Sequence, residues 1–149
     1  MNTKHIYLKE IDKKIISFIK KHHILTLATA NKNTPYCCTC FYVYSEKENK
    51  FFITSEKDTR HINEALQQPI VAGTIALETS IIGKIQGLQL TGTIRKISGE
   101  ETKKAKSIYI KKFPVAALTK LVLWGITPDF IKFTDNRLGF GKKLIWQKK

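Results

Sequence analysis

The chain has 149 residues, 42% of them hydrophobic, and its 26 lysines and arginines against 12 acidic residues give a formal net charge of +14. This length suits one compact domain and leaves little room for two. The charge favours an acidic partner: a nucleic acid, an anionic membrane surface or a phosphorylated ligand. Only Arg60, Arg95 and Arg137 are arginines. Arginine is the residue best suited to bidentate base contacts, so the composition disfavours a specific nucleic-acid reader and leaves weak, salt-sensitive polyanion binding.

The start of the chain shows no apolar segment of the signal-peptide type, because Lys4, Lys9, Glu10 and Asp12 interrupt it. No apolar run elsewhere is long enough to cross a bilayer. We therefore expect a cytoplasmic protein that does not enter a membrane.

The three cysteines, Cys37, Cys38 and Cys40, lie within four positions of one another. An odd, clustered set favours a reducing compartment over a disulfide framework. We expect the thiols to act as small buried hydrophobic groups, with a redox role as the alternative. We expect no metal site, because no recognisable ligand spacing joins the cysteines to the histidines, which are His5, His22, His23 and His61.

Hydrophobic periodicity predicts a mostly β chain with three helices. Apolar residues at three- and four-residue steps predict a first, amphipathic helix over residues 7–23. Further helices are predicted over 58–68 and 98–113, the latter opened by a capping box of Ser98 and Glu101. Gly87 and Gly92 mark bulges or close backbone approaches in a long strand. Strands are predicted over 24–30, 35–44, 51–55, 70–75, 85–97, 121–127 and 130–134.

The junction between the third predicted strand and the next helix carries the richest chemistry. The strand ends in the hydroxyl residues Thr54 and Ser55, and after a polar gap the helix begins with Thr59, Arg60 and His61. A helix start offers unpaired backbone N–H groups and the positive end of the helix dipole, and both stabilise an anion. The hydroxyls, the guanidinium and the imidazole can all donate to phosphate oxygens.

The same junction has an ordinary structural interpretation. Ser55 or Asp58 can simply cap the helix, with Arg60 and His61 on its solvated face. The carboxylate of Asp58 also counts against a phosphate site, because it would repel the anion.

This junction resembles the phosphate-binding turn of the pyridoxamine-phosphate-oxidase-like FMN-binding split barrels. In that superfamily the third strand ends in a hydroxyl pair, and a Ser-Arg-Lys-like triplet follows after a short loop. Thr54 and Ser55 match the strand end, and Thr59, Arg60 and His61 match the triplet. His61 replaces the usual lysine, so we expect weaker or pH-dependent phosphate binding.

Most of the chain, from Ile24 to Trp146, resembles the small YhbP-like branch of that superfamily. Together with the strand pattern, the resemblance implies a mainly β (α+β) fold, a six-stranded Greek-key split β-barrel with flanking helices spanning residues 1–149. It also implies a homodimer with FMN at the interface. The matching segments are EKDTRH (56–61), VAGTI (71–75), GLQLTGTIRKISGEE (87–101), KKFPVA (111–116) and IKFTDNRLGFGKKLIW (131–146).

The resemblance further implies which residues contact the cofactor. The second strand would run along the flavin ring and touch it through backbone groups at Cys38, Thr39 and Cys40. Gln89 would lie near the flavin, or else be an outward-facing strand glutamine. Trp124, Arg137 and Lys142 are candidates for contacts from the second subunit, and each has an alternative in the core or on the surface.

A bound FMN would itself carry the hydride or electron transfer, which explains why the sequence needs no Ser-His-Asp set, paired carboxylates or metal cluster. We therefore expect an FMN-dependent oxidoreductase with an unknown small-molecule substrate, in which Arg60 holds the phosphate. Pyridoxamine-phosphate oxidation is disfavoured, because the full set of C-terminal substrate residues of the true oxidases is not found. Two alternatives are a non-catalytic split barrel that binds or senses flavin or haem, and a polyanion-binding protein that uses the basic surface.

Overall fold

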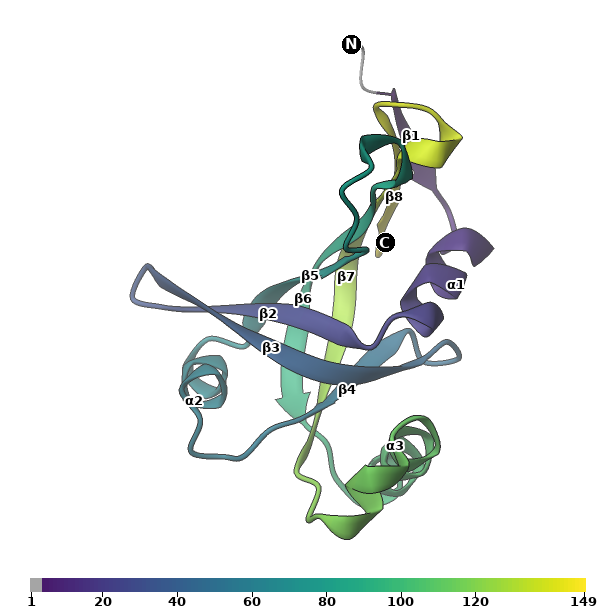
Figure 1. The fold of residues 1–149 in the computed structure, drawn as a ribbon. Helices are drawn as coiled ribbons and strands as arrows, with labels where there is room; N and C mark the ends of the chain where they lie inside the picture. The colour runs from purple at the N-terminus through teal and green to yellow at the C-terminus, as the bar shows by residue number, and fades with distance from the viewer. Residues whose placement is uncertain (1–3) are drawn as a thin grey trace.

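A computed structural model gives the fold and describes residues 4–149 (Figure 1). Six strands follow one another around a barrel in the order β7-β4-β3-β2-β5-β6, and β6 pairs again with β7 to close the ring. This confirms the expected six-stranded split barrel with flanking helices. The strands are β2 (Ile24–Asn31), β3 (Thr34–Ser45), β4 (Lys50–Thr54), β5 (Ile70–Ala76), β6 (Gln86–Lys96) and β7 (Leu123–Asp135).

Strand β7 is continuous where the sequence predicts two strands, over 121–127 and 130–134, so that prediction is wrong in its division. Pro128 does not break the strand, because it faces Gly92 where the β6–β7 register shifts between Thr91 and Gly92. A bulge is one of the few places where a strand tolerates proline, which cannot donate to the ladder. The prediction of a bulge at Gly92 is confirmed. The unbroken strand pairs with β4 near its start and with β8 (Lys142–Gln147) near its end.

The helix predicted over residues 7–23 is wrong in its first part. Residues Lys4–Leu8 form strand β1, which pairs in parallel with β8 and extends the sheet beyond the barrel (Figure 1). Helix α1 spans Lys13–Lys21, and the Asp12 carboxylate caps it by accepting a hydrogen bond from Lys14 N at 2.7 Å. Ile11 lies before the helix but still packs against the core, which explains why the apolar spacing predicts a helix that begins too early.

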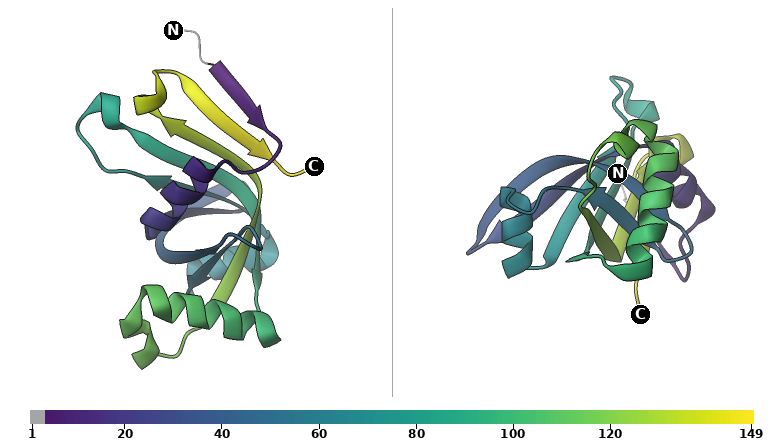
Figure 2. Two further views of the ribbon diagram at one scale, coloured as in Figure 1. Left: turned by 90° about the vertical axis from the view of Figure 1, so that its right-hand side faces the viewer. Right: turned by 90° about the horizontal axis from the view of Figure 1, so that it is seen from below.

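Two further helices lie on the periphery of the barrel. Helix α2 (Arg60–Gln67) lies beside β2, and α3 (Gly99–Lys112) lies below the strands in the view of Figure 1 (Figures 1 and 2). The helix predicted over 98–113 is confirmed, but its capping box is wrong. Ser98 makes no side-chain cap hydrogen bond, and the Glu101 carboxylate instead pairs with Lys50 and Arg95. Short 3-10 turns occupy Ile82–Lys84, Pro114–Leu118 and Asn136–Leu138.

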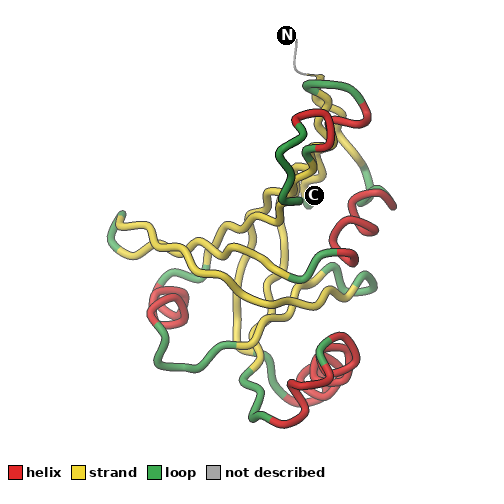
Figure 3. Tube along the Cα trace, in the orientation of Figure 1, coloured by secondary structure: helices red, strands yellow, loops and turns green. Residues whose placement is uncertain are grey.

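The core fills the barrel interior, because alternate strand residues point inward and are apolar. A smaller apolar cluster lies under α3 and includes Phe52, Ala105 and Tyr109. The connection from β4 to α2 is a loop at the barrel surface (Figure 3). Within residues 4–149, none of the helices combines the length and apolar character that crossing a membrane requires.

Candidate functional site

Strand β3 has an edge that is only partly paired. Strand β2 pairs with its residues 34–41, whereas β4 pairs only with residues 42–45. Over residues 34–41 the second edge therefore has no strand partner among the described parts of the chain. Tyr42 N donates to His23 O on the β2 side at 3.0 Å. Because backbone groups alternate along a strand, those of Cys37, Thr39 and Phe41 face the open edge.

The side chains of β3 alternate between the inner and the outer face of the sheet. Cys38 and Cys40 point toward the barrel interior, where Cys40 is 6% exposed and Cys38 is half-buried, while Cys37 and Thr39 are exposed on the outer face. Of the three residues implied to contact a flavin through the backbone, Thr39 is thus the one whose backbone faces the open edge. Cys38 and Cys40 present thiols on the inner face.

The loop after β4 gathers three side chains into one hydrogen-bonded cluster. The Ser55 hydroxyl lies 2.6 Å from His61 Nε2 and 3.1 Å from Thr59 Oγ1, and Thr59 Oγ1 lies 3.3 Å from the same imidazole nitrogen. Thr59 donates its own proton to Glu56 O at 2.9 Å. Trp124 Nε1 donates to Ser55 O at 3.0 Å, which ties the loop to the core. Ser55, Thr59 and His61 are therefore brought together as the sequence suggests.

The first turn of α2 has no side-chain cap. Thr59 occupies the N-cap position, but its side chain accepts no hydrogen bond from the helix amides. The interpretation in which Ser55 or Asp58 caps this helix is therefore wrong, as is the placement of His61 on a solvated face, because His61 is half-buried and bonded to Ser55. Thr54 ends β4, where it pairs with Leu123. The amide groups at the start of α2 are available to an anion.

Arg60 is held in one orientation by two neighbours. Its Nε donates to Glu64 Oε1 at 2.8 Å, and its Cζ lies 4.2 Å from the centre of the Tyr36 ring. The Glu64 carboxylate is 7% exposed and also accepts a hydrogen bond from Thr29 Oγ1 at 2.6 Å. The Thr29 hydrogen bond, followed by that from Arg60, lowers the pKa of Glu64 and keeps the carboxylate charged. Within residues 4–149, no protein acceptor engages the two Nη groups of Arg60, so both can bind a ligand.

His61 offers this site a neutral donor. Burial lowers the pKa of its imidazole, and the negative charge of Glu64 opposes that shift in part. A lysine in this position would add a full positive charge, so replacing it with His61 lowers the charge that would meet an anion at neutral pH.

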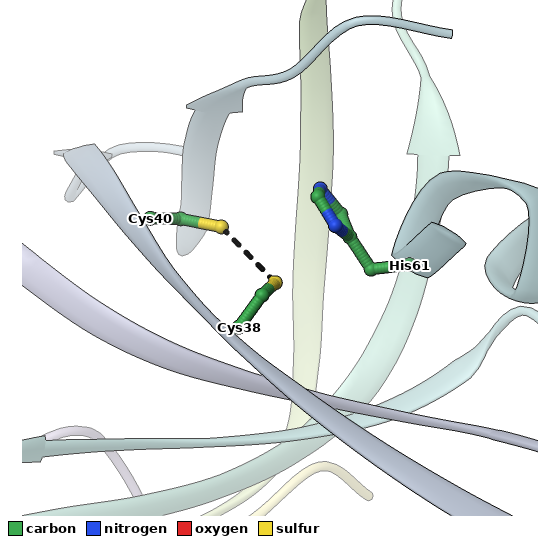
Figure 4. A group of neighbouring side chains, drawn as sticks. All are labelled: Cys38, Cys40 and His61. Carbon is green, nitrogen blue, oxygen red and sulfur yellow. Dashed lines mark hydrogen bonds between the residues drawn. The ribbon is translucent and has the colours of Figure 1, made fainter. Parts of the chain in front are cut away.

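The structure also brings His61 to two of the cysteines. The Sγ atoms of Cys38 and Cys40 are 3.7 Å apart, and one ring nitrogen of His61 lies with them in a group whose atoms are all within 4.8 Å of one another (Figure 4). The expectation that no histidine pairs with the cysteines is therefore wrong. The hydrogen bond between the two thiols lowers the pKa of Cys38, and the same bond together with burial raises the pKa of Cys40. Sequence spacing could not show this cluster, because β3 and α2 are brought together only by the fold.

The other residues implied to contact a cofactor lie elsewhere in the chain. Gln89 is exposed on β6 and lines an outer cavity of about 380 Å³ together with Cys37. Arg137 pairs with Asp135 through Nε at 2.9 Å and Nη2 at 2.7 Å. Lys142 is the first residue of β8, a strand that lies away from α2 (Figure 1). Trp124 is 2% exposed in the core, so its side chain does not face a second subunit. Of these four residues, Trp124 alone makes a hydrogen bond to the β4–α2 loop among the described residues, through Nε1 and Ser55 O.

The solved structures that this chain resembles share its split-barrel fold. The haem storage protein HutZ from Vibrio cholerae aligns with a TM-score of 0.66 at 15% identity, over 78% of this chain and 89% of that one. An FAD-binding protein from Mesorhizobium loti aligns with a TM-score of 0.65 at 14% identity, over 80% and 88%. A Listeria innocua protein named as a pyridoxamine 5′-phosphate oxidase aligns with a TM-score of 0.64 at 16% identity, over 81% and 95%. At these identities the likeness concerns the fold.

Sequence relatives identify the family of this chain. A UPF0306 protein of Klebsiella pneumoniae is 40% identical over 131 residues, which cover 88% of this chain and 89% of the relative. A UPF0306 protein of Photorhabdus laumondii is also 40% identical over 131 residues, which cover 88% and 92%. The chain belongs to the UPF0306 family. The family and the split-barrel fold agree with the resemblance drawn from the sequence. No family profile matches it.

Proposed function

We propose that this protein binds FMN at the β4–α2 loop and acts as an FMN-dependent oxidoreductase on a small-molecule substrate. The observation that carries the proposal is the placement of Arg60, which Glu64 and Tyr36 hold at the uncapped start of α2 with both Nη groups available. A planar guanidinium and free helix amides together suit a phosphate monoester. The FAD-binding split barrel from Mesorhizobium loti supports a flavin.

The donors at the loop fit a phosphate group. Thr59 commits its proton to Glu56 O, so its oxygen can accept from Ser55 or from His61. If His61 Nε2–H donates to Ser55 Oγ or Thr59 Oγ1, the Ser55 hydroxyl is free to donate its own hydrogen bond to an incoming phosphate oxygen. The loop can thus add a hydroxyl donor to the Arg60 guanidinium without leaving a buried group unpaired.

The flavin ring would supply the hydride or electron transfer, and the protein would supply its position and surroundings. We place the ring along the open edge of β3, where the backbone groups of Cys37, Thr39 and Phe41 can bond its polar edge. We propose a homodimer, in which Arg137 and Lys142 of a second copy approach the ring.

The test is FMN binding by the full chain, measured by flavin fluorescence during titration and by the visible spectrum after unbound FMN is removed. Arg60→Ala removes at least one charge-assisted hydrogen bond worth about 1.5–3 kcal/mol, so we expect Kd to rise by at least about 10- to 150-fold. Arg95→Ala is the matched control, because Arg95 is a partly exposed arginine paired with Glu101 outside the site. Unchanged affinity in Arg60→Ala would refute the phosphate site, and a wild-type protein that takes up no FMN would refute the flavin function.

A non-catalytic cofactor-binding role is the second candidate, favoured by the neutral imidazole of His61 and by the fold shared with HutZ, a haem storage protein. A neutral imidazole is a competent ligand for haem iron. Titration with haemin would show a shifted Soret band in the wild type and a smaller shift in His61→Gln. Bound flavin that no reductant can reduce would favour this candidate over the oxidoreductase.

A further inference from the structure

We propose that Cys38, Cys40 and His61 form a Zn²⁺ site with two thiolates and one imidazole as protein ligands and a water molecule in the fourth position. The proposal goes beyond flavin binding and does not depend on it. The two sites share His61 and the adjoining loop, but the thiols lie on the inner face of β3 and Arg60 lies at the surface.

The sulfur atoms already have the spacing that a single zinc ion imposes. With Zn–S bonds of about 2.3 Å and a tetrahedral angle, two thiolate ligands lie about 3.8 Å apart. The Cys38 and Cys40 Sγ atoms are 3.7 Å apart. Thiolate and imidazole ligands of one zinc ion lie about 3.6 Å apart by the same geometry. The three candidate atoms are all within 4.8 Å of one another, so side-chain rotation of about 1 Å would complete the set.

The scaffold around these ligands is rigid. The pleat of β3 places residues two apart on one face, so Cys38 and Cys40 meet while both are held in the ladder with β2. His61 comes from the first turn of α2, a helix anchored by Ile62 and Ala65 in the core. Ligands on regular elements hold a site more precisely than ligands on loops.

The imidazole also has the outer support that metal-binding histidines need. Ser55 Oγ lies 2.6 Å from Nε2. If Nδ1 binds the metal, this oxygen accepts the Nε2–H and fixes the ring, as outer-shell partners do in zinc sites. If Nε2 binds the metal, Ser55 lies next to the ion and can hydrogen-bond its water ligand.

The donor set selects the metal and the kind of site. Two thiolates and an imidazole suit zinc and copper(I) and disfavour calcium and magnesium, which prefer oxygen ligands. Cys37 cannot join, because its side chain is on the outer face of the strand. Three protein ligands and one open position are typical of zinc sites that bind an exogenous ligand, whereas structural sites are closed by four.

The test is Zn²⁺ binding by the reduced full chain, measured by competition with a chromophoric chelator and by metal content after dialysis. We expect one zinc per chain in the wild type and at least a 100-fold loss of affinity in Cys38→Ser and His61→Gln. Cys37→Ser and His23→Gln are matched controls and should bind as the wild type does. Equal loss in Cys37→Ser and Cys38→Ser would overturn the proposal, as would a wild type that binds no zinc or only copper(I).

A second readout does not depend on any variant folding. Co²⁺ added to the wild type should give thiolate-to-cobalt charge-transfer absorption and the intense visible bands of tetrahedral cobalt, and their absence would overturn the ligand assignment. Zinc binding should survive in Arg60→Ala. Failure of the flavin proposal and failure of the zinc proposal therefore give different results.

Discussion

Gly92 is required where β6 and β7 approach most closely. A Cβ added at Gly92 would lie 2.4 Å from Thr127 O and 2.9 Å from both Pro128 Cα and Thr127 C. An ordinary carbon-to-oxygen contact is about 3.3 Å, so the overlap with the carbonyl oxygen is about 0.9 Å. All three atoms belong to the backbone of β7, so no side-chain rotation can relieve the overlap. We expect Gly92→Ala to force the two strands apart at the bulge that closes the barrel.

The size of this effect follows from the atoms involved. Overpacking in a core costs about 1–3 kcal/mol, and overlap with paired backbone belongs at the upper end, at about 3 kcal/mol. At about 2–4 °C of Tm per kcal/mol for a chain of this size, Gly92→Ala should lower Tm by about 6–12 °C. The assay is thermal unfolding followed by circular dichroism at fixed protein concentration, so that any dimer contributes equally.

Gly87→Ala in the same strand is the control. A Cβ at Gly87 meets nothing closer than Ile75 O at 3.8 Å, an ordinary contact. Removing a glycine from the unfolded chain stabilises a protein by about 0.4–1 kcal/mol where the native backbone permits it, so this variant should melt at or slightly above the wild-type temperature. If the two variants melt at the same temperature, the close approach at Pro128 is refuted.

Two further substitutions test contacts outside the site. Tyr42→Phe removes the hydroxyl that donates to Ile19 O at 2.6 Å at the end of α1. The carbonyl left buried and unpaired should lower the free energy of unfolding by about 1–3 kcal/mol. This loss is measured as a lower urea midpoint, and an unchanged midpoint would contradict the hydrogen bond. Asp135→Asn tests how the free energy of unfolding depends on pH. Hydrogen bonds from Arg137 hold the pKa of the Asp135 carboxyl below its ordinary 3.8. The carboxylate therefore stabilises the wild type above pH 3.8, and this stabilisation is lost as the pH falls through the lower folded-state pKa. The difference in unfolding free energy between wild type and variant should therefore shrink in acid, and a difference independent of pH would contradict the ion pair.

Contiguous features of the sequence gave the most reliable predictions. The β4–α2 loop could be recognised because Ser55, Thr59 and His61 are close along the chain and meet locally. The strands of the barrel could be placed from their alternation. The anchoring of Arg60 by Glu64 was also readable in principle, because residues four apart on a helix are neighbours.

Features that depend on distant pairing were missed or misplaced. His61 meets Cys38 and Cys40 only because α2 folds beside β3, and no spacing rule reports that distance. The division of β7 is wrong because a proline usually ends a strand, whereas the bulge that accommodates Pro128 depends on the pairing of β7 with Thr91 and Gly92 on β6. The helix predicted over 7–23 includes the last two residues of β1, because the five residues of this strand owe their conformation to β8, at the other end of the chain.

The parallel pairing of β1 with β8 sets an order on biosynthesis. Every strand of the barrel precedes residue 136, so the ring can close once β7 has left the ribosome. Strand β1 emerges before the other described strands but has no partner until Lys142–Gln147 is synthesised, which makes this contact among the most distant in the described chain. During that interval β1 is an unpaired edge segment, and its Lys4 and His5 help protect it from pairing with other chains. The first of the described strands to be synthesised is therefore among the last to be paired.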